Sequence, residues 1–271
     1  MAQISAKDVH ALRKKTGLSM MACKNALVEA DGDPVAAEQA LRVKLKGKMD
    51  TRSDRAAGEG RVAIATRDGK AAIVELSAET DFTAKNDSFG DAANKIADLA
   101  CDLPAGDASA TDEMTKLIDE LRISTGENIS IARIAVAEGG SFGRYVHHDG
   151  KTAVLLQAKG DIPEQVAADI CMHITAAVPR PEGVTRDDVP ESVIERERKL
   201  ALDMAMEQGK PEEIAQKIVE GKVNKLYAEL ALLEQPFVKD PDKKIQDLLP
   251  SDATITAFHR WQVGELTPAE A

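Results

Sequence analysis

The chain has 271 residues, of which 43% are hydrophobic and 30% charged, and this composition is typical of a soluble globular protein with room for more than one domain. Its net charge of -11 disfavours nonspecific binding to nucleic acid or anionic membranes, which are also negative; residues 42–48 are the densest basic exception. Three scattered cysteines form no disulfide or metal-binding pattern, and no apolar run reaches membrane-spanning length. We therefore expect a cytoplasmic protein without cofactor, bound metal, membrane contact or direct contact with nucleic acid.

The first 45 residues carry the start signals of three short helices. Ser5 is followed by Asp8, Ser19 precedes an apolar stretch, and Asp33 precedes Pro34, and each is a common arrangement at a helix N-terminus. Three short helices in this span predict a bundle resembling the ubiquitin-associated type over residues 1–45. The charged residues 46–59 have no persistent apolar face, and they predict a linker, either without regular structure or helical in part.

Met20 and Met21 are adjacent at the start of the second predicted helix. Neighbouring residues of a helix point about 100° apart, so both side chains hardly face one core. Either one methionine belongs to the core and the other is incidental, or the pair forms a docking patch, since methionine adapts to partner surfaces.

Two later stretches form a repeat. Each has Gly-Arg, a short run, Asp-Gly-Lys and an apolar run, with the Asp-Gly pairs at 68–69 and 149–150. Asp-Gly between runs of high β-propensity predicts a hairpin. Helical spacing follows each hairpin, and a strand closes each unit. We expect an α+β core of two subdomains, each with a small, mostly antiparallel sheet covered by helices, over 60–140 and over 141–181 with 231–271.

The second unit is interrupted by residues 182–230. Two helical stretches with apolar residues three and four apart flank Gly209-Lys210-Pro211, which predicts an inserted antiparallel helical hairpin with a tight tip. Such an arm serves either to contact other molecules or simply to pack on itself.

No sequence motif for catalysis or phosphate binding is present. A GxxxxGK[ST] loop, a GxSxG elbow and an HExxH helix are all absent from the sequence. His173 lies on an apolar helical stripe, where a core or cleft-lining role is expected. We therefore expect an interaction protein and not an enzyme.

Phe82 is an aromatic residue in polar surroundings, Glu79-Thr-Asp-Phe-Thr-Ala-Lys-Asn-Asp87, in a chain with only five phenylalanines. Either it folds inward or it serves another protein. Inward packing strands its polar neighbours away from water, so we predict that residues 79–86 form a projecting connection with Phe82 exposed. The next helix is predicted to begin at Asp87 or Ser88.

Several motifs together resemble the bacterial elongation factor Ts family, in family order and over almost the whole chain. They are Leu12–Gly17, Met20–Leu27, Thr80–Asn86, Gly126–Ile129, Met172-His173, Gly209–Pro211, Val219–Lys222 and Gln235–Val238. The family fold is an N-terminal bundle, a two-subdomain core and a coiled-coil arm, in agreement with the elements predicted above.

The resemblance implies a guanine nucleotide exchange factor that binds elongation factor Tu, either GDP-bound or nucleotide-free. The segment Thr80, Asp81, Phe82 and Thr83 is implied to reach the partner's GTPase domain and to disturb its Mg²⁺ site. Further implied partner contacts are Met20, Met21, Lys24, Thr125, Gly126 and His173. Pairing of two copies, in a complex of two factors with two partners, also occurs within the family.

Thr83 and Thr125 stand where the family usually has aliphatic residues, so the resemblance does not carry over the apolar part of those two contacts. Two other functions fit parts of the sequence. The bundle alone suits a ubiquitin-type or nascent-chain adaptor, which leaves residues 80–83 unexplained. An enzyme using His173 with a nearby carboxylate is the other.

Overall fold

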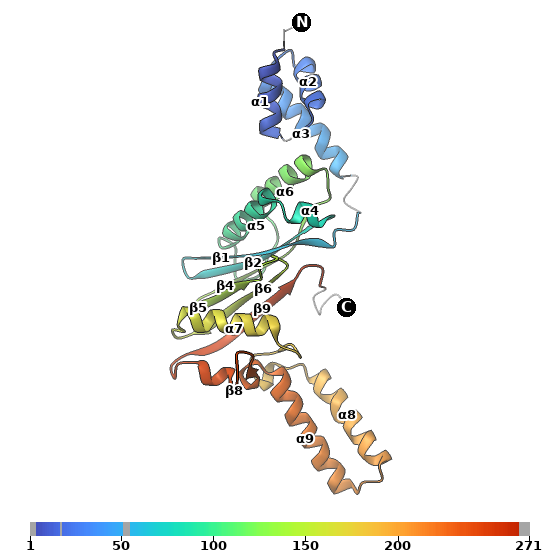
Figure 1. Cartoon of the computed structure of the whole chain (residues 1–271), viewed down its shortest axis with the longest axis vertical. Helices are drawn as coiled ribbons and strands as arrows, with labels where there is room; N and C mark the ends of the chain where they lie inside the picture. Colours follow the sequence, from blue (N-terminus) through green and yellow to red (C-terminus); the bar gives the residue numbers. More distant parts are fainter. Residues whose placement is uncertain (1–3, 17, 51–54, 266–271) are drawn as a thin grey trace.

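The computed structural model describes residues 4–16, 18–50 and 55–265, and for residues 44–50 it describes the backbone alone. Figure 1 shows three parts in a row: a helical bundle, two β-sheets with their covering helices, and a pair of long helices. This confirms the predicted α+β fold class. Within the described ranges, no helix has the length and apolarity needed to cross a membrane.

The N-terminal bundle consists of α1 (Ala6–Thr16), α2 (Met20–Glu29) and α3 (Pro34–Asp50). The predicted caps are confirmed: Ser5, Ser19 and Asp33 each accept a hydrogen bond from a backbone N–H in the first turn, at 3.2, 3.3 and 2.8 Å. The bundle core is small and consists of Val9, Leu12, Cys23, Ala26, Leu27, Ala37 and Leu41.

Helix α3 is longer than the sequence predicted. A linker was expected over residues 46–59, whereas α3 continues to Asp50, and β1 (Glu59–Arg67) already begins at Glu59. Lysine, leucine and methionine are good helix formers, so the helix persists here without an apolar stripe. Residues 51–54 of the expected linker, and the side chains from 44 onward in the basic stretch, lie outside the described part of the chain.

The first sheet has the strand order β1-β2-β4-β3, with β2 (Lys70–Ala78), β3 (Gly106–Asp107) and β4 (Ser130–Glu138). Its helices are α4 (Asp81–Ala84), α5 (Asp87–Ala100) and α6 (Asp112–Thr125). The predicted hairpin turn is confirmed, with φ of 52° at Asp68 and 75° at Gly69, the left-handed values that a tight hairpin requires. The core between sheet and helices includes Phe89, Ile96 and Met114.

The second sheet repeats this plan, with order β5-β6-β9 and strands β5 (Ser141–Val146), β6 (Thr152–Lys159) and β9 (Thr254–Gln262). Helix α7 (Glu164–Ala176) packs on it. The remaining short elements are η1 (Arg186–Asp188), η2 (Leu232–Glu234), β7 (Pro236–Phe237), β8 (Asp240–Lys244) and η3 (Ile245–Leu248). The three main strands and α7 agree with the prediction, whereas β7 and β8 were not predicted.

The two sheets pack against each other through a shared apolar layer that includes Ile73, Leu155 and Trp261. An ion pair lies beside this layer: Glu75, only 2% exposed, accepts a hydrogen bond from Arg133 at 2.7 Å. The Arg133 guanidinium also lies 4.5 Å from the centre of the Trp261 ring. The pair itself lies within the first sheet, and it reaches the second subdomain through Trp261 and through the Gly264 N–H, which donates to Glu75 at 3.0 Å. Removing either partner leaves the other charge buried and unpaired, which destabilises this contact between the subdomains.

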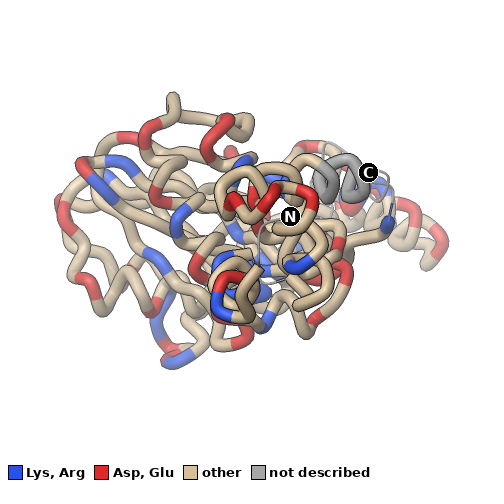
Figure 2. The backbone as a smooth tube through the Cα atoms, turned by 90° about the horizontal axis from the view of Figure 1, so that it is seen from above, with Lys and Arg blue, Asp and Glu red and all other residues tan. Residues whose placement is uncertain are grey.

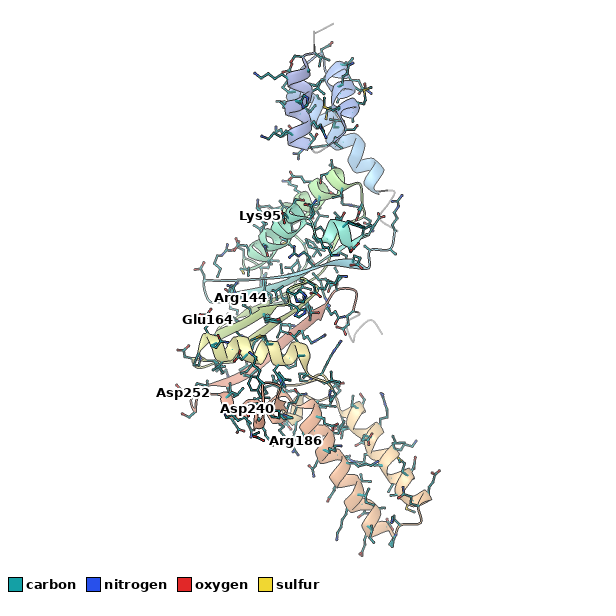
Figure 3. All side chains as sticks on the ribbon, viewed as in Figure 1. Lys95, Arg144, Glu164, Arg186, Asp240 and Asp252 are labelled. Atoms are coloured by element: carbon teal, nitrogen blue, oxygen red, sulfur yellow. The ribbon has the colours of Figure 1, made fainter. Side chains whose placement is uncertain are left out.

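The arm consists of α8 (Glu191–Glu207) and α9 (Glu212–Leu230), which confirms the predicted helical hairpin. Gly209 supplies the turn at its tip, with φ of 68°. At the base the two chain segments meet, because the Glu182 N–H donates to the Leu230 carbonyl at 2.9 Å. Arg186, labelled in Figure 3, also bridges the base, donating to Asn224 of α9 at 3.0 Å and to Glu234 at 2.7 Å.

His173 joins α7 to the base of the arm. Its Nε2 lies 2.8 Å from Gln235 Oε1, and its Nδ1 accepts a hydrogen bond from the Val238 N–H at 3.3 Å. The Gln235 amide in turn donates to the Glu229 carbonyl at 2.6 Å. Because Nδ1 is an acceptor, the ring is neutral with its proton on Nε2. Burial lowers the pKa of His173, although the hydrogen bond to Gln235 opposes this shift.

We predict that the arm is dispensable for folding of the core. Residues 196–222 form the outer part of the hairpin, whereas the base contacts of Arg186 and His173 lie outside that range. Replacing residues 196–222 with a four-residue Gly/Ser link is expected to shift the melting temperature by no more than about 4 °C, because surface insertions contribute little to the parent core. Calorimetry measures this, and loss of cooperative unfolding contradicts it.

We also predict that the stability of the protein falls as the pH is lowered below about 6.5, the ordinary histidine pKa. The pKa of His173 is lower in the folded state than in the unfolded chain. As the pH falls, the unfolded chain therefore takes up this proton at a higher pH, and protonation stabilises the unfolded state relative to the folded one. In the variant His173→Gln, the slope of the unfolding free energy against pH should become smaller. It should not vanish, because burial also lowers the pKa of His259.

Urea unfolding at several pH values measures the slope. The matched control is His10→Gln, which changes an exposed histidine of α1 and is expected to leave the slope unchanged. An unaltered slope in His173→Gln contradicts the prediction.

Candidate functional site

The segment 79–86, predicted as a projecting connection, contains the one-turn helix α4. Thr80 caps the one-turn helix α4, its Oγ1 accepting from the Thr83 N–H at 3.3 Å. Asn86 caps α5 in the same way, through the Ser88 N–H at 3.1 Å. The polar residues around Phe82 therefore include two helix caps, and the predicted start of the next helix at Asp87 is confirmed.

Two carboxylates join the start of this turn to the residues that follow α6. Glu127 accepts hydrogen bonds from the Thr80 hydroxyl at 2.6 Å and from the Thr80 N–H at 3.1 Å. Glu79 accepts one from the Asn128 N–H at 2.6 Å. Hydrogen bonds to charged acceptors are the strong ones, so residues 79–80 are held firmly against residues 127–128. We call this arrangement the Glu127 clamp.

Phe82 is 83% exposed, as predicted. The neighbouring Thr83 and Ala84, at 9% and 3% exposure, face the core instead. The short helix thus anchors one side of the turn and presents the ring on the other. An exposed large aromatic residue on a rigid turn is a typical anchor for a partner protein.

Asp81 lies beside Phe82 and forms an ion pair with Lys85, one helical turn later, at 2.6 Å. The Lys85 ammonium holds the pKa of the Asp81 carboxyl below its usual range. Both side chains are on the surface, so Asp81 carries its charge next to the exposed ring at neutral pH. The exposed part of the turn therefore offers one apolar and one anionic group.

A second candidate surface lies on α2 of the bundle. Met21 is 63% exposed and Lys24, one turn later, is also exposed, whereas Met20 packs partly against the bundle core. The two methionines therefore differ in environment, as the helical geometry indicated. Val28, a further turn along, is 54% exposed and extends the same stripe. Sequence reasoning missed it, although its i, i+3, i+7 spacing from Met21 was visible.

Thr125 and Gly126 end α6 and lead into the Glu127 clamp. Gly126 adopts φ of 75°, the left-handed conformation that glycine favours after a helix. The Thr125 hydroxyl donates to the Leu121 carbonyl at 2.8 Å, so it is used within its own helix. Both residues are half-buried.

Two of the candidate contact residues are not on the surface. Thr83 was expected to contact a partner, but its side chain is buried because α4 packs that side against the first sheet. His173 was also expected as a contact, yet it is 1% exposed and bonded to Gln235 and Val238. In the free protein these two side chains are therefore not available on the surface, and their contact with a partner stays a prediction.

The structure also shows the surroundings of His173, the residue named for the enzyme alternative. Its two ring nitrogens contact the Gln235 side-chain oxygen and the Val238 N–H, and no carboxylate among the described residues is hydrogen-bonded to the ring. Over the described ranges, no group of three or more metal-ligating side chains gathers in one place. In Figure 2, acidic and basic residues are interspersed along the backbone as seen from above. The most exposed apolar feature of the segment 79–86 is thus the Phe82 ring, on a turn that hydrogen bonds to Glu127 hold in place.

Comparisons with known proteins agree on one family. The family model described as elongation factor TS matches residues 79–265. Elongation factor Ts of Burkholderia thailandensis is 41% identical over 273 residues, covering 98% of this chain and 92% of that protein. Elongation factor Ts of Hahella chejuensis is 40% identical over 272 residues, covering 98% of this chain and 93% of that protein. The chain therefore belongs to the elongation factor Ts family.

Proposed function

We propose that this protein is a translation elongation factor that binds elongation factor Tu in its GDP-bound form and promotes release of GDP, so that GTP binds next. The observation that carries the proposal is Phe82, 83% exposed on a turn that the Glu127 clamp holds in place. It acts by binding and not as an enzyme. We place it in the cytoplasm, with the translation apparatus.

The physical basis of exchange is reciprocal coupling. If this protein and the nucleotide weaken each other's binding to Tu, each lowers the affinity of the other by the same ratio. Burying the Phe82 ring in the partner supplies roughly 1.5–3 kcal/mol. Mg²⁺ links the phosphates of the nucleotide to the protein that holds them, so displacing its ligands removes a large part of the nucleotide's binding free energy. In this proposal Phe82 drives that displacement and Asp81 accompanies it.

Contacts by the bundle complete the interaction. Met21 and Lys24 lie on the outer face of α2 and supply an adaptable apolar group and a positive charge. In this proposal Thr83, Thr125, Gly126 and His173 act indirectly, by positioning the turn and the base of the arm. The nucleotide-free complex is the intermediate, and binding of GTP to Tu dissociates it.

The number of copies of each protein in the complex follows from the same proposal. We propose one factor for each Tu as the working unit, with the two-plus-two complex of the family as the alternative. Sedimentation of an equimolar mixture separates the two masses.

The direct test is release of labelled GDP from Tu of the same organism. Adding this protein should accelerate release, and the acceleration should saturate as the complex forms. Release at the intrinsic rate, at concentrations where the two proteins bind each other, contradicts the proposal.

For Phe82→Ala we predict an acceleration of GDP release at least about tenfold smaller, because roughly 1.4 kcal/mol or more of contact is lost in the transition state. The stability of the free protein should change by less than about 0.5 kcal/mol, since the ring is exposed. Stopped-flow release and urea unfolding measure both quantities on one variant.

The matched control is Phe89→Ala, whose ring is 1% exposed in the first core. It should lose about 3–5 kcal/mol of stability, while the folded fraction retains exchange activity. If Phe82→Ala shows this pattern instead, Phe82 has a structural role and the proposal is wrong.

For Glu127→Ala we predict reduced exchange although the variant does not change Phe82. Removing the carboxylate leaves the Thr80 N–H and hydroxyl without their acceptor, so the turn opens more readily. GDP release should slow by about three- to tenfold, and backbone amides 80–84 should exchange hydrogen faster. Glu113→Ala, an exposed acid at the start of α6, is the control and should change neither. Unchanged amide exchange in Glu127→Ala contradicts the role of the clamp.

A further inference from the structure

A cleft of about 1010 Å³ opens beside β9, away from Phe82 and from the outer face of α2. One wall is β9 itself, and the opposite wall comes from β3 and β4 of the first sheet. The start of the arm closes one end. The lining residues that matter here are Ala132, Arg180, Val193, Phe258 and Arg260.

The β9 wall is the edge of the second sheet, since β9 pairs with β6 alone among the described strands. The Val263 N–H donates to the Lys151 carbonyl at 2.9 Å, and in an antiparallel ladder the bonded pairs alternate. The main-chain groups of Trp261 and His259 therefore face β6. Those of Phe258 and Arg260 point toward the cleft, and the structure shows no partner for them among the residues it describes.

Two guanidinium groups converge at this edge. Arg180 and Arg260 both bind the single carboxylate of Glu265, the second at 3.1 Å, and both donate to the Gln262 side-chain oxygen, at 3.4 and 3.1 Å. The Arg260 side chain is only 9% exposed, and its buried Nε has no hydrogen-bond partner within the described ranges. Two positive charges thus share one negative charge, and a buried donor is left over.

Burial, reinforced by the charge of Arg180, lowers the pKa of the Arg260 guanidinium. Both causes penalise the charged form of Arg260, and the negative charge of a second carboxylate at this point offsets that penalty. This is the environment in which an arginine pair binds an anionic side chain.

We propose that this cleft binds an extended peptide segment of a partner protein, which adds a strand to the free edge of β9 and places one acidic side chain between Arg180 and Arg260. Main-chain hydrogen bonds to Phe258 and Arg260 supply affinity, as in other complexes formed by strand addition. The acidic side chain supplies the register.

The geometry also limits the segment. Side chains of a strand alternate between faces, so the residues on either side of the acid point toward the face that carries His259 and Trp261. The rim of the cleft carries the carboxylates of Asp107 and Glu182. We therefore expect a single acid flanked by β-branched or aromatic residues, and not an acidic run.

The test uses a phage-displayed library of random seven-residue peptides, selected on the full-length protein. Enriched peptides should carry one Asp or Glu between β-branched or aromatic residues. Synthesised and labelled, they should bind about tenfold more weakly to Arg180→Gln, which removes one charged contact. Peptide binding should also slow hydrogen exchange at the amides of Phe258 and Arg260, which an anion bound only by side chains does not do.

The matched control is Arg144→Gln, an exposed arginine on β5 (Figure 3), which should bind the peptides as the unchanged protein does. Several results overturn the proposal: no enriched peptide, equal affinity for Arg180→Gln, or binding without protection of the β9 amides. Complete displacement of the peptides by inorganic phosphate identifies a small-anion site instead. A homodimer that Arg180→Gln dissociates identifies a second copy as the occupant.

Discussion

The antiparallel register between β2 and β4 is the constraint on which the proposed site depends. It pairs Ser77 with Ser130 at the end of the ladder. Continuing the same register by two and three residues places Glu79 opposite Asn128 and Thr80 opposite Glu127. Where the main-chain pairing of β2 with β4 ends, the side chains of Glu79 and Glu127 thus take over the contacts between the two segments, in the same register. Because register in a half-buried sheet is strongly specified, the position of the Phe82 turn is specified with it.

Features set by local sequence were predictable. Asp68-Gly69 allows the left-handed turn that joins β1 to β2, and Gly209 with Pro211 separates the two helices of the arm. The exposure of Phe82 was also predictable, because so many polar neighbours cannot all follow it inward. The polarity of Thr80 and Asn86 also has a local cause that the sequence did not reveal, because both residues cap helices.

Features set by contacts distant in sequence were not predictable. Glu127 lies 47 residues from Thr80, and His173 lies 62 residues from Gln235. No periodicity reports such pairs. The burial of Thr83 depends on how α4 sits on the first sheet, and a four-residue helix leaves no pattern to read. The length of α3 followed helix propensity where the absence of an apolar stripe had indicated a linker.

Helix α6 connects the two proposed contact surfaces physically. Near its middle, Glu120 forms an ion pair with Arg42 of α3 at 3.2 Å, and α3 packs with α2, which carries Met21. At its C-terminal end, Gly126 turns the chain directly into Glu127. A rigid helix thus has the bundle against its side and the clamp at its end. The ion pair is exposed and contributes little stability by itself. The ion pair between Arg42 and Glu120 therefore adds little to the hold of α6 on the bundle, whereas the charged hydrogen bonds of Glu127 to Thr80 fix the Phe82 turn to the other end of α6.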